Sequence, residues 1–140
     1  MSLNNAEIES VRASWQRFTQ QNKYNYVLLV YRILFNKHPQ YKALFPHDLE
    51  DIRDNILQSV NFLMDHLDQS AQLQPEFERL GTIHHECGVK PDMFADMVKC
   101  LAQALLEIKR DDVSEEDVKH WEHLFEFFAN GIINAYPGQL

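Results

Sequence analysis

An apolar residue returns every three or four positions along almost the whole chain, and this helical repeat constrains the fold more than any other feature. The clearest stripe places five side chains on one face of a helix: Ile52, Ile56, Val60, Leu63 and Leu67. The same spacing recurs over residues 8–18, 27–35, 77–84, 94–105 and 121–132. Four glycines and five prolines are too few for the turns of a β-protein. We therefore predict an all-α fold of about six to eight helices.

Capping residues and helix breakers predict where these helices begin and end. Asn4 or Asn5 is expected to cap the first helix, and Ser114 the last. The polar stretch "QQNKYN" predicts a break before the second helix. Pro75 is expected to open the helix that ends at Gly88, which is a natural C-terminal cap.

Length and charge limit the classes of protein to consider. The 140 residues, 45% of them hydrophobic, suit one compact domain over residues 1–140. Thirteen basic against 21 acidic residues give a net charge of -8, which argues against nucleic acid or an anionic membrane as a partner. No apolar run approaches the ~18 residues of a transmembrane helix. The N-terminus does not resemble a signal peptide, and the two cysteines, Cys87 and Cys100, lack the spacing of a disulfide framework. We therefore expect a cytoplasmic protein with reduced thiols.

Two adjacent histidines stand in "LGTIHHECGVKPDMF", residues 80–94. His84 lies one helical turn beyond Leu80 and two beyond Phe77, so it shares their apolar face. A histidine there needs a partner, because burying an unpaired polar group is unfavourable. The pattern alone favours a satisfied core or helix-end histidine over a ligand. His85 points about 100° away and is expected to be exposed.

The motif residues of this stretch occur in the same order as in the globin segment that carries the axial haem ligand, so the stretch resembles that segment. The matching residues are Leu80, Gly81, His84, Gly88, Val89, Pro91 and Phe94. Upstream, "VYRILFNKHPQYKALFP" is similar to the corresponding segment of bacterial flavohaemoglobins and single-domain globins. Trp121 and Phe125 resemble the start of the last globin helix. The resemblance covers nearly the whole chain and implies a globin fold packed around a haem pocket.

The resemblance assigns His84 as the ligand of the haem iron and Tyr31 as a hydrogen-bond donor to the bound gas. The alternative interpretation of Tyr31 is a tyrosine packed between helices with its hydroxyl on a backbone carbonyl. The position that faces the gas from the opposite helix falls on Ile52. A shift of register would place Asn55 or Arg53 there, or His47 would swing in.

The resemblance also implies the residues that enclose haem b. The expected apolar cage consists of Phe45, Ile56, Val60, Leu80, Val89, Phe94 and Met97. Arg53 and Lys90 are candidate partners of the haem propionates, and are otherwise ordinary surface charges.

The implied activity is reversible binding of a diatomic gas (O2, NO or CO) for transport, scavenging or sensing by a bacterial globin. Flavohaemoglobins place a tyrosine and a glutamate around the axial histidine, where this chain has Phe94 and Tyr136. This departure argues against autonomous NO dioxygenase turnover. The alternatives are an NO dioxygenase or peroxidase served by a separate reductase, and a haem-free globin-fold signalling module. A fused signalling domain would make the chain part of a sensor.

Overall fold

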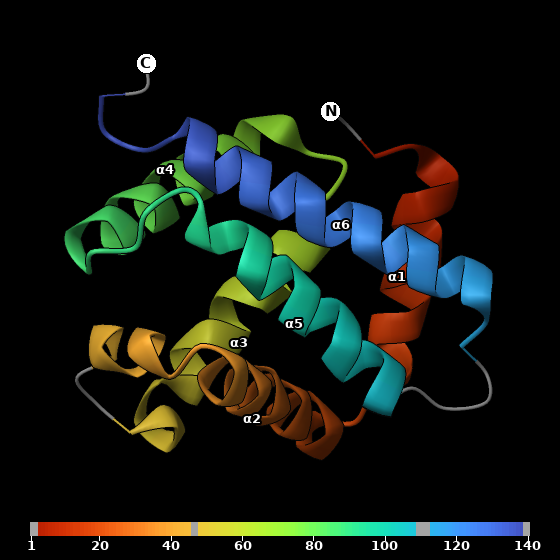
Figure 1. The fold of residues 1–140 in the computed structure, drawn as a ribbon. Coiled ribbons are helices and arrows are strands. Elements are labelled where there is room, and N and C mark those ends of the chain that lie inside the picture. Colours follow the sequence, from red (N-terminus) through yellow and green to blue (C-terminus); the bar gives the residue numbers. More distant parts are fainter. Residues whose placement is uncertain (1–2, 46–47, 109–112, 139–140) are drawn as a thin grey trace.

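The chain is helical throughout the part that the computed structural model describes, residues 3–45, 48–108 and 113–138. Within these ranges it forms six α-helices and one 3-10 helix, and no strand. In chain order they are α1 (Asn5–Arg17), α2 (Gln20–Lys37), η1 (Pro39–Leu44), α3 (Leu49–Asp65), α4 (Ser70–Glu86), α5 (Met93–Ile108) and α6 (Glu115–Asn134) (Figure 1). The all-α prediction is confirmed, with a helix number inside the expected range.

The first and last helices begin at the predicted caps. The Asn4 side chain accepts a hydrogen bond from the Glu7 backbone N–H at 2.8 Å, and the Glu7 side chain accepts from the Asn4 backbone. Ser114 and Asp117 form the same reciprocal pair at the start of α6. Each pair satisfies two backbone donors that a helix start leaves without partners.

Two predicted limits are wrong. The stretch "QQNKYN" belongs to α2, which Thr19 caps, because its two glutamines and Asn25 are exposed while Tyr26 and Val27 enter the core. The second error concerns α4, which begins at Ser70 with Pro75 inside it. Pro75 is exposed and removes one backbone hydrogen bond, but the buried Leu73 and Phe77 hold the helix on either side.

The helices bury two hydrophobic clusters. In Figure 1, α5 lies between α2 and α6, while α1 and α4 pack near opposite ends of α6. The larger cluster joins α1, α2, α3, α5 and α6, and contains Trp15 and Trp121 with ring centroids 6.1 Å apart. The smaller cluster joins the end of α3, α4, the start of α5 and the end of α6, and contains Phe77, Phe94 and Tyr136. Residues of the predicted pocket are found in or against both clusters.

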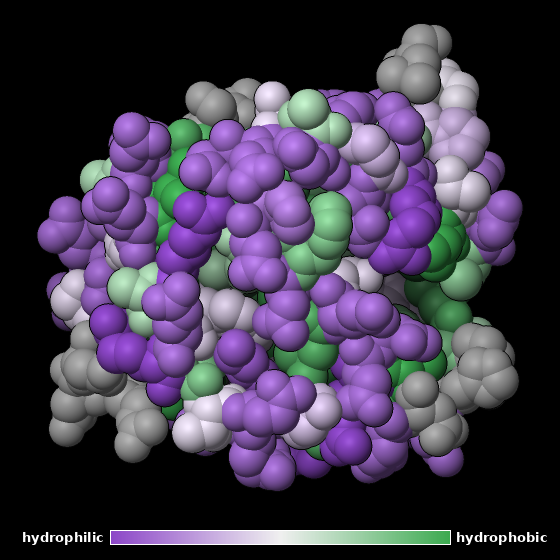
Figure 2. Space-filling model, turned by 180° about the vertical axis from the view of Figure 1, so that it is seen from behind, coloured by the Kyte–Doolittle hydropathy of each residue, from purple (hydrophilic) through white to green (hydrophobic). Residues whose placement is uncertain are grey.

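Polar side chains cover most of one face of the molecule. Figure 2 shows a largely hydrophilic back face, on which hydrophobic surface is visible at the right-hand edge, at the upper left and near the centre. This edge corresponds to the left of Figure 1, where α4 ends. None of the helices in the described ranges combines the length and the apolar character that crossing a bilayer requires.

Candidate functional site

His84 lies in the last turn of α4 with its ring mostly removed from solvent. Burial lowers the pKa of His84, because it disfavours the charged imidazolium, and the backbone bond to Leu80 acts in the opposite direction. His84 Nδ1 lies 2.7 Å from the Leu80 carbonyl oxygen. A carbonyl only accepts hydrogen bonds, so Nδ1 carries the proton and Nε2 carries the lone pair. A neutral imidazole oriented in this way is the form that ligates a metal.

The turn after α4 fixes the backbone at His84. Gly88 has a φ of +87°, a left-handed conformation that glycine adopts with little strain. The Val89 N–H donates to the His84 carbonyl at 3.0 Å, and the Gly88 N–H donates to the His85 carbonyl at 3.1 Å. These two bonds form a Schellman motif in which His84 is the third residue from the helix end. The prediction of Gly88 as the C-terminal cap is confirmed, and His85 is exposed as expected.

Phe94 and Tyr136 lie beside this turn. The Phe94 ring centroid is 5.4 Å from that of His84 and 6.0 Å from that of Tyr136. The Tyr136 hydroxyl donates to the Val89 carbonyl at 2.8 Å, and its ring contacts His85 rather than His84. Sequence comparison with flavohaemoglobins missed this bond, because nothing in the spacing joins two residues 47 positions apart. The His84 imidazole is held by the neutral Leu80 carbonyl, and no carboxylate of the described residues bonds to it.

Tyr31 and Phe45 form an aromatic group with Phe35. The Tyr31 ring centroid lies 5.1 Å from that of Phe45 and 6.0 Å from that of Phe35, while Phe35 and Phe45 are 5.2 Å apart. Burial raises the pKa of Tyr31 to about 12, so the hydroxyl keeps its proton. Among the hydrogen bonds of the described residues, none involves this hydroxyl. The Tyr31 side chain is half-buried, so this hydroxyl donor without a protein acceptor is available to a ligand.

The α3 residues expected in the pocket are half-buried at four-residue spacing. Ile52, Ile56 and Val60 lie on one face of α3, and Ile56 and Val60 pack against the larger cluster. Asn55, one alternative for the position facing the gas, is exposed. His47, another alternative, lies outside the described residues. The face that α3 turns inward at these positions is therefore apolar.

Arg53, the remaining alternative, is directed toward α2. Its guanidinium carbon lies 4.4 Å from the centroid of the Tyr24 ring. Its buried Nε has no hydrogen-bond partner and is 3.7 Å from an Asp54 carboxylate oxygen. That unsatisfied donor leaves Arg53 able to bond an acidic group such as a propionate. Lys90, the other candidate partner, is exposed on the turn after α4.

The remaining cage residues are divided between the two clusters. Leu80, Val89 and Phe94 belong to or pack against the smaller cluster, and Met97 packs against the larger. Apart from the buried Phe94, these side chains are only half-buried, although they are apolar. The residues fit a haem: a neutral imidazole with Nε2 available, an unpaired tyrosine hydroxyl, and incompletely covered apolar side chains.

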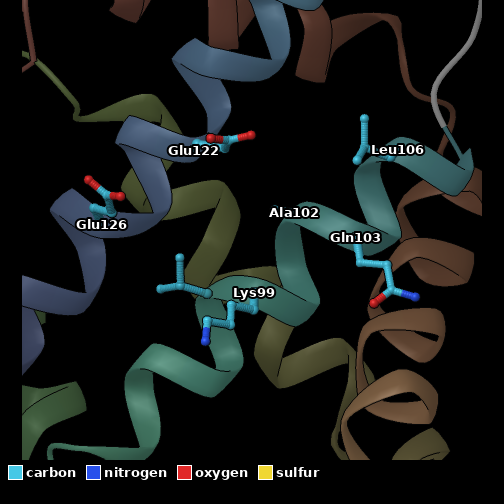
Figure 3. Close-up of a pocket in the computed structure, with 7 residues that line it drawn as sticks. Lys99, Ala102, Gln103, Leu106, Glu122 and Glu126 are labelled. Atoms are coloured by element: carbon cyan, nitrogen blue, oxygen red, sulfur yellow. The ribbon is translucent and has the colours of Figure 1, made fainter. Parts of the chain in front are cut away.

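A hollow between α5 and α6 is lined by none of the predicted site residues. It has a volume of about 390 Å³, and Figure 3 shows Lys99, Ala102, Gln103 and Leu106 from α5 with Glu122 and Glu126 from α6. Its lining combines charged groups of both signs with apolar surface.

Cys87 is exposed and Cys100 buried, and both are free thiols.

Comparison with known sequences places these features in a family context. The sequence model of the globin family matches residues 28–132. A globin of Aequiyoldia eightsii is 26% identical over 147 residues, covering 94% of this chain and 97% of the relative. An uncharacterized globin-like protein of Aquifex aeolicus is 27% identical over 104 residues, covering 74% and 73%. A flavohemoprotein of Halalkalibacterium halodurans is 23% identical over 108 residues, which are 75% of this chain and 26% of the relative.

Solved structures share the fold across almost the whole chain. A hexacoordinated heme protein from an anhydrobiotic tardigrade gives a TM-score of 0.85 at 21% identity, covering 96% of this chain and 95% of the other. An engineered carbene transferase from Rhodothermus marinus gives 0.84 at 22% identity, covering 95% and 92%. At these identities the likeness concerns the fold alone.

Proposed function

The chain belongs to the globin family, and we propose that it binds haem b through His84 and reversibly binds a diatomic gas on the opposite side of the pocket. The observation that carries this proposal is the His84 ring, with Nδ1 bonded to Leu80 and Nε2 available on a neutral imidazole. Haem, held by His84, would supply an iron able to bind a diatomic gas.

On the proximal side of the proposed haem, the end of α4 and the turn that follows it hold His84 in place. The Leu80 carbonyl fixes the rotation of the His84 ring, and the Val89 N–H fixes the end of its helix. Phe94 covers one flank of the imidazole with an apolar ring. These contacts leave Nε2 as the nitrogen for coordination and keep water from the imidazole.

On the distal side, Tyr31 is the polar contact that we assign to the gas. Its hydroxyl donates a hydrogen bond to the outer atom of a polar diatomic ligand such as O2. Ile52 and Ile56 contribute apolar surface on the same side, which limits the access of water. Phe45 packs edge-on against Tyr31 and restricts the directions that its hydroxyl can take.

Binding is favoured over turnover by the proximal contacts. A carboxylate on Nδ1 would increase electron donation by the imidazole, and here Nδ1 bonds a neutral carbonyl instead. NO dioxygenase or peroxidase activity would need electrons from a separate reductase. We therefore place gas binding first, with transport, scavenging and sensing in a cytoplasmic setting as its proposed uses. The unpaired Tyr31 hydroxyl and the oriented His84 disfavour a haem-free module.

Absorption spectroscopy of hemin-reconstituted protein tests the proposal. We expect a Soret band that His84→Ala abolishes or shifts and that the adjacent control His85→Ala leaves unchanged. His84→Gly with added imidazole should restore the band, which separates lost coordination from lost folding. A wild-type spectrum in His84→Ala, or loss of the band in His85→Ala, would contradict the assignment.

A further inference from the structure

The 3-10 helix η1 is attached to α5 by a small polar network. The Tyr41 hydroxyl donates to the Asp96 carboxylate at 2.6 Å. The His38 ring stacks on the Tyr41 ring with centroids 5.1 Å apart, and His38 Nε2 lies 3.8 Å from the other Asp96 oxygen. Asp96 is in the first turn of α5, where the helix dipole stabilises its negative charge.

This network supplements the other contacts of η1, which packs on α2 and places the Tyr41 ring against the larger cluster. None of the residues Pro39–Leu44 is buried. Short 3-10 helices have poorer hydrogen-bond geometry than α-helices and depend on their surroundings for a fixed position. The charge-assisted bond from Tyr41 to Asp96 joins η1 to a long helix that is itself packed on α2 and α6.

The position of η1 controls the aromatic group around Tyr31. Phe45 is the C-cap residue directly after η1, and its backbone N–H donates to the Lys42 carbonyl at 3.1 Å. The Phe45 ring lies edge-on to Tyr31, and both contact Phe35. A displacement of η1 is therefore transmitted to Phe45 and, through ring contact, to Tyr31.

We propose that Tyr41 and Asp96 are positioning residues for gas binding, because their bond holds η1 and thereby Phe45 in the place that orients the Tyr31 hydroxyl. This inference rests on the proposed function. Tyr41 and Asp96 act through Phe45 and Tyr31, so their effect on a bound gas should depend on the Tyr31 hydroxyl.

The test uses haem-reconstituted protein and two readouts, the C–O stretching band of the CO complex and the rate of O2 dissociation. Tyr41→Phe and Asp96→Asn should broaden or shift the band in the direction that Tyr31→Phe shifts it. They should also speed O2 dissociation by about threefold to tenfold, as a partial loss of one hydrogen bond would. Tyr26→Phe is the matched control, since it also removes a tyrosine hydroxyl that bonds α5. It should leave the band and the rate unchanged.

A double variant distinguishes positioning of Tyr31 from general loosening. In a Tyr31→Phe background, Tyr41→Phe should have no further effect on either readout, and an additional effect would overturn the inference. If Tyr31→Phe changes both readouts while Tyr41→Phe alone changes neither, the positioning role is wrong and the proposed function stands. If Tyr31→Phe changes neither, the gas contact assigned to Tyr31 fails and the positioning role with it.

Discussion

Removal of the Tyr136 hydroxyl should loosen the turn that carries the proximal side of the pocket. Tyr136→Phe keeps the ring that packs on Phe94 and removes only the bond to the Val89 carbonyl. Tyr26→Phe is a close control, because Tyr26 donates to the Leu101 carbonyl, also at 2.8 Å. The two tyrosines are nearly equally buried, with 3% and 4% of their surface exposed.

The two substitutions differ in what they leave behind. Leu101 lies inside α5, so its carbonyl keeps its helical bond from the fourth residue ahead. Val89 lies between α4 and α5, and no backbone N–H of the described residues donates to its carbonyl. Losing a typical bond costs about 0.5–1.5 kcal/mol, and an unpaired buried carbonyl costs about 1–3 kcal/mol. Because Val89 is half-buried, we expect about 1–2 kcal/mol for Tyr136→Phe and about 0.5–1 kcal/mol for Tyr26→Phe.

Urea unfolding followed by circular dichroism measures the two free energies of unfolding, provided that the slope m is unchanged. The rate of haem transfer to an excess of an acceptor apoprotein then measures how strongly the loosened turn weakens haem retention. We expect faster haem loss in Tyr136→Phe than in Tyr26→Phe, since only the former frees the turn beside His84. Equal destabilisation, or a larger loss in Tyr26→Phe, would refute the argument from the unpaired turn carbonyl.

Three further substitutions have expected outcomes. Tyr31→Phe should speed O2 dissociation by roughly tenfold in stopped-flow measurements, because a lost bond of about 1.4 kcal/mol corresponds to that factor. Gly81→Ala should lower the free energy of unfolding by about 1 kcal/mol in urea: the gain in helix propensity is outweighed by overpacking, since a Cβ would lie 3.0 Å from two carbonyl oxygens at the end of α6. Glu7→Gln should lower the melting temperature most between pH 4.5 and 6.5. The bond to Glu7 raises the pKa of His123, so its contribution is present below 6.5 and is lost as pH rises through the folded value. The same bond lowers the pKa of Glu7, so its contribution is present above 4.5 and is lost as pH falls. A loss that does not vary with pH would contradict this account.

Features that depend on neighbouring residues could be predicted from the sequence. The caps at Asn4, Ser114 and Gly88 each depend on contacts within a few residues, and the structure has them where expected. The same holds for the exposure of His85 relative to His84, which follows from helix geometry alone. The start of α4 could not be predicted, because the contacts that offset Pro75 are made with other helices.

Contacts between distant segments were the part of the site that sequence patterns did not show. Tyr41 and Asp96 are 55 positions apart, and each has an ordinary surface composition around it. The Tyr136–Val89 bond likewise needs the fold before it can be seen. The direction of Arg53 toward Tyr24 depends on how α2 and α3 pack. The roles assigned to His84, Tyr31 and Ile52 stay predictions until the spectra and rates above are measured.

The positions of the two tryptophans make indole fluorescence a reporter that is independent of the Soret band. Both tryptophans, Trp15 and Trp121, belong to the larger cluster, whereas Phe94 and Tyr136 beside His84 belong to the smaller one. In hemin-free protein, indole fluorescence therefore reports on α1, α6 and their neighbours and not on the end of α4. A variant whose Soret band is lost while its hemin-free form keeps the native indole emission wavelength has lost the haem site and kept the larger cluster closed.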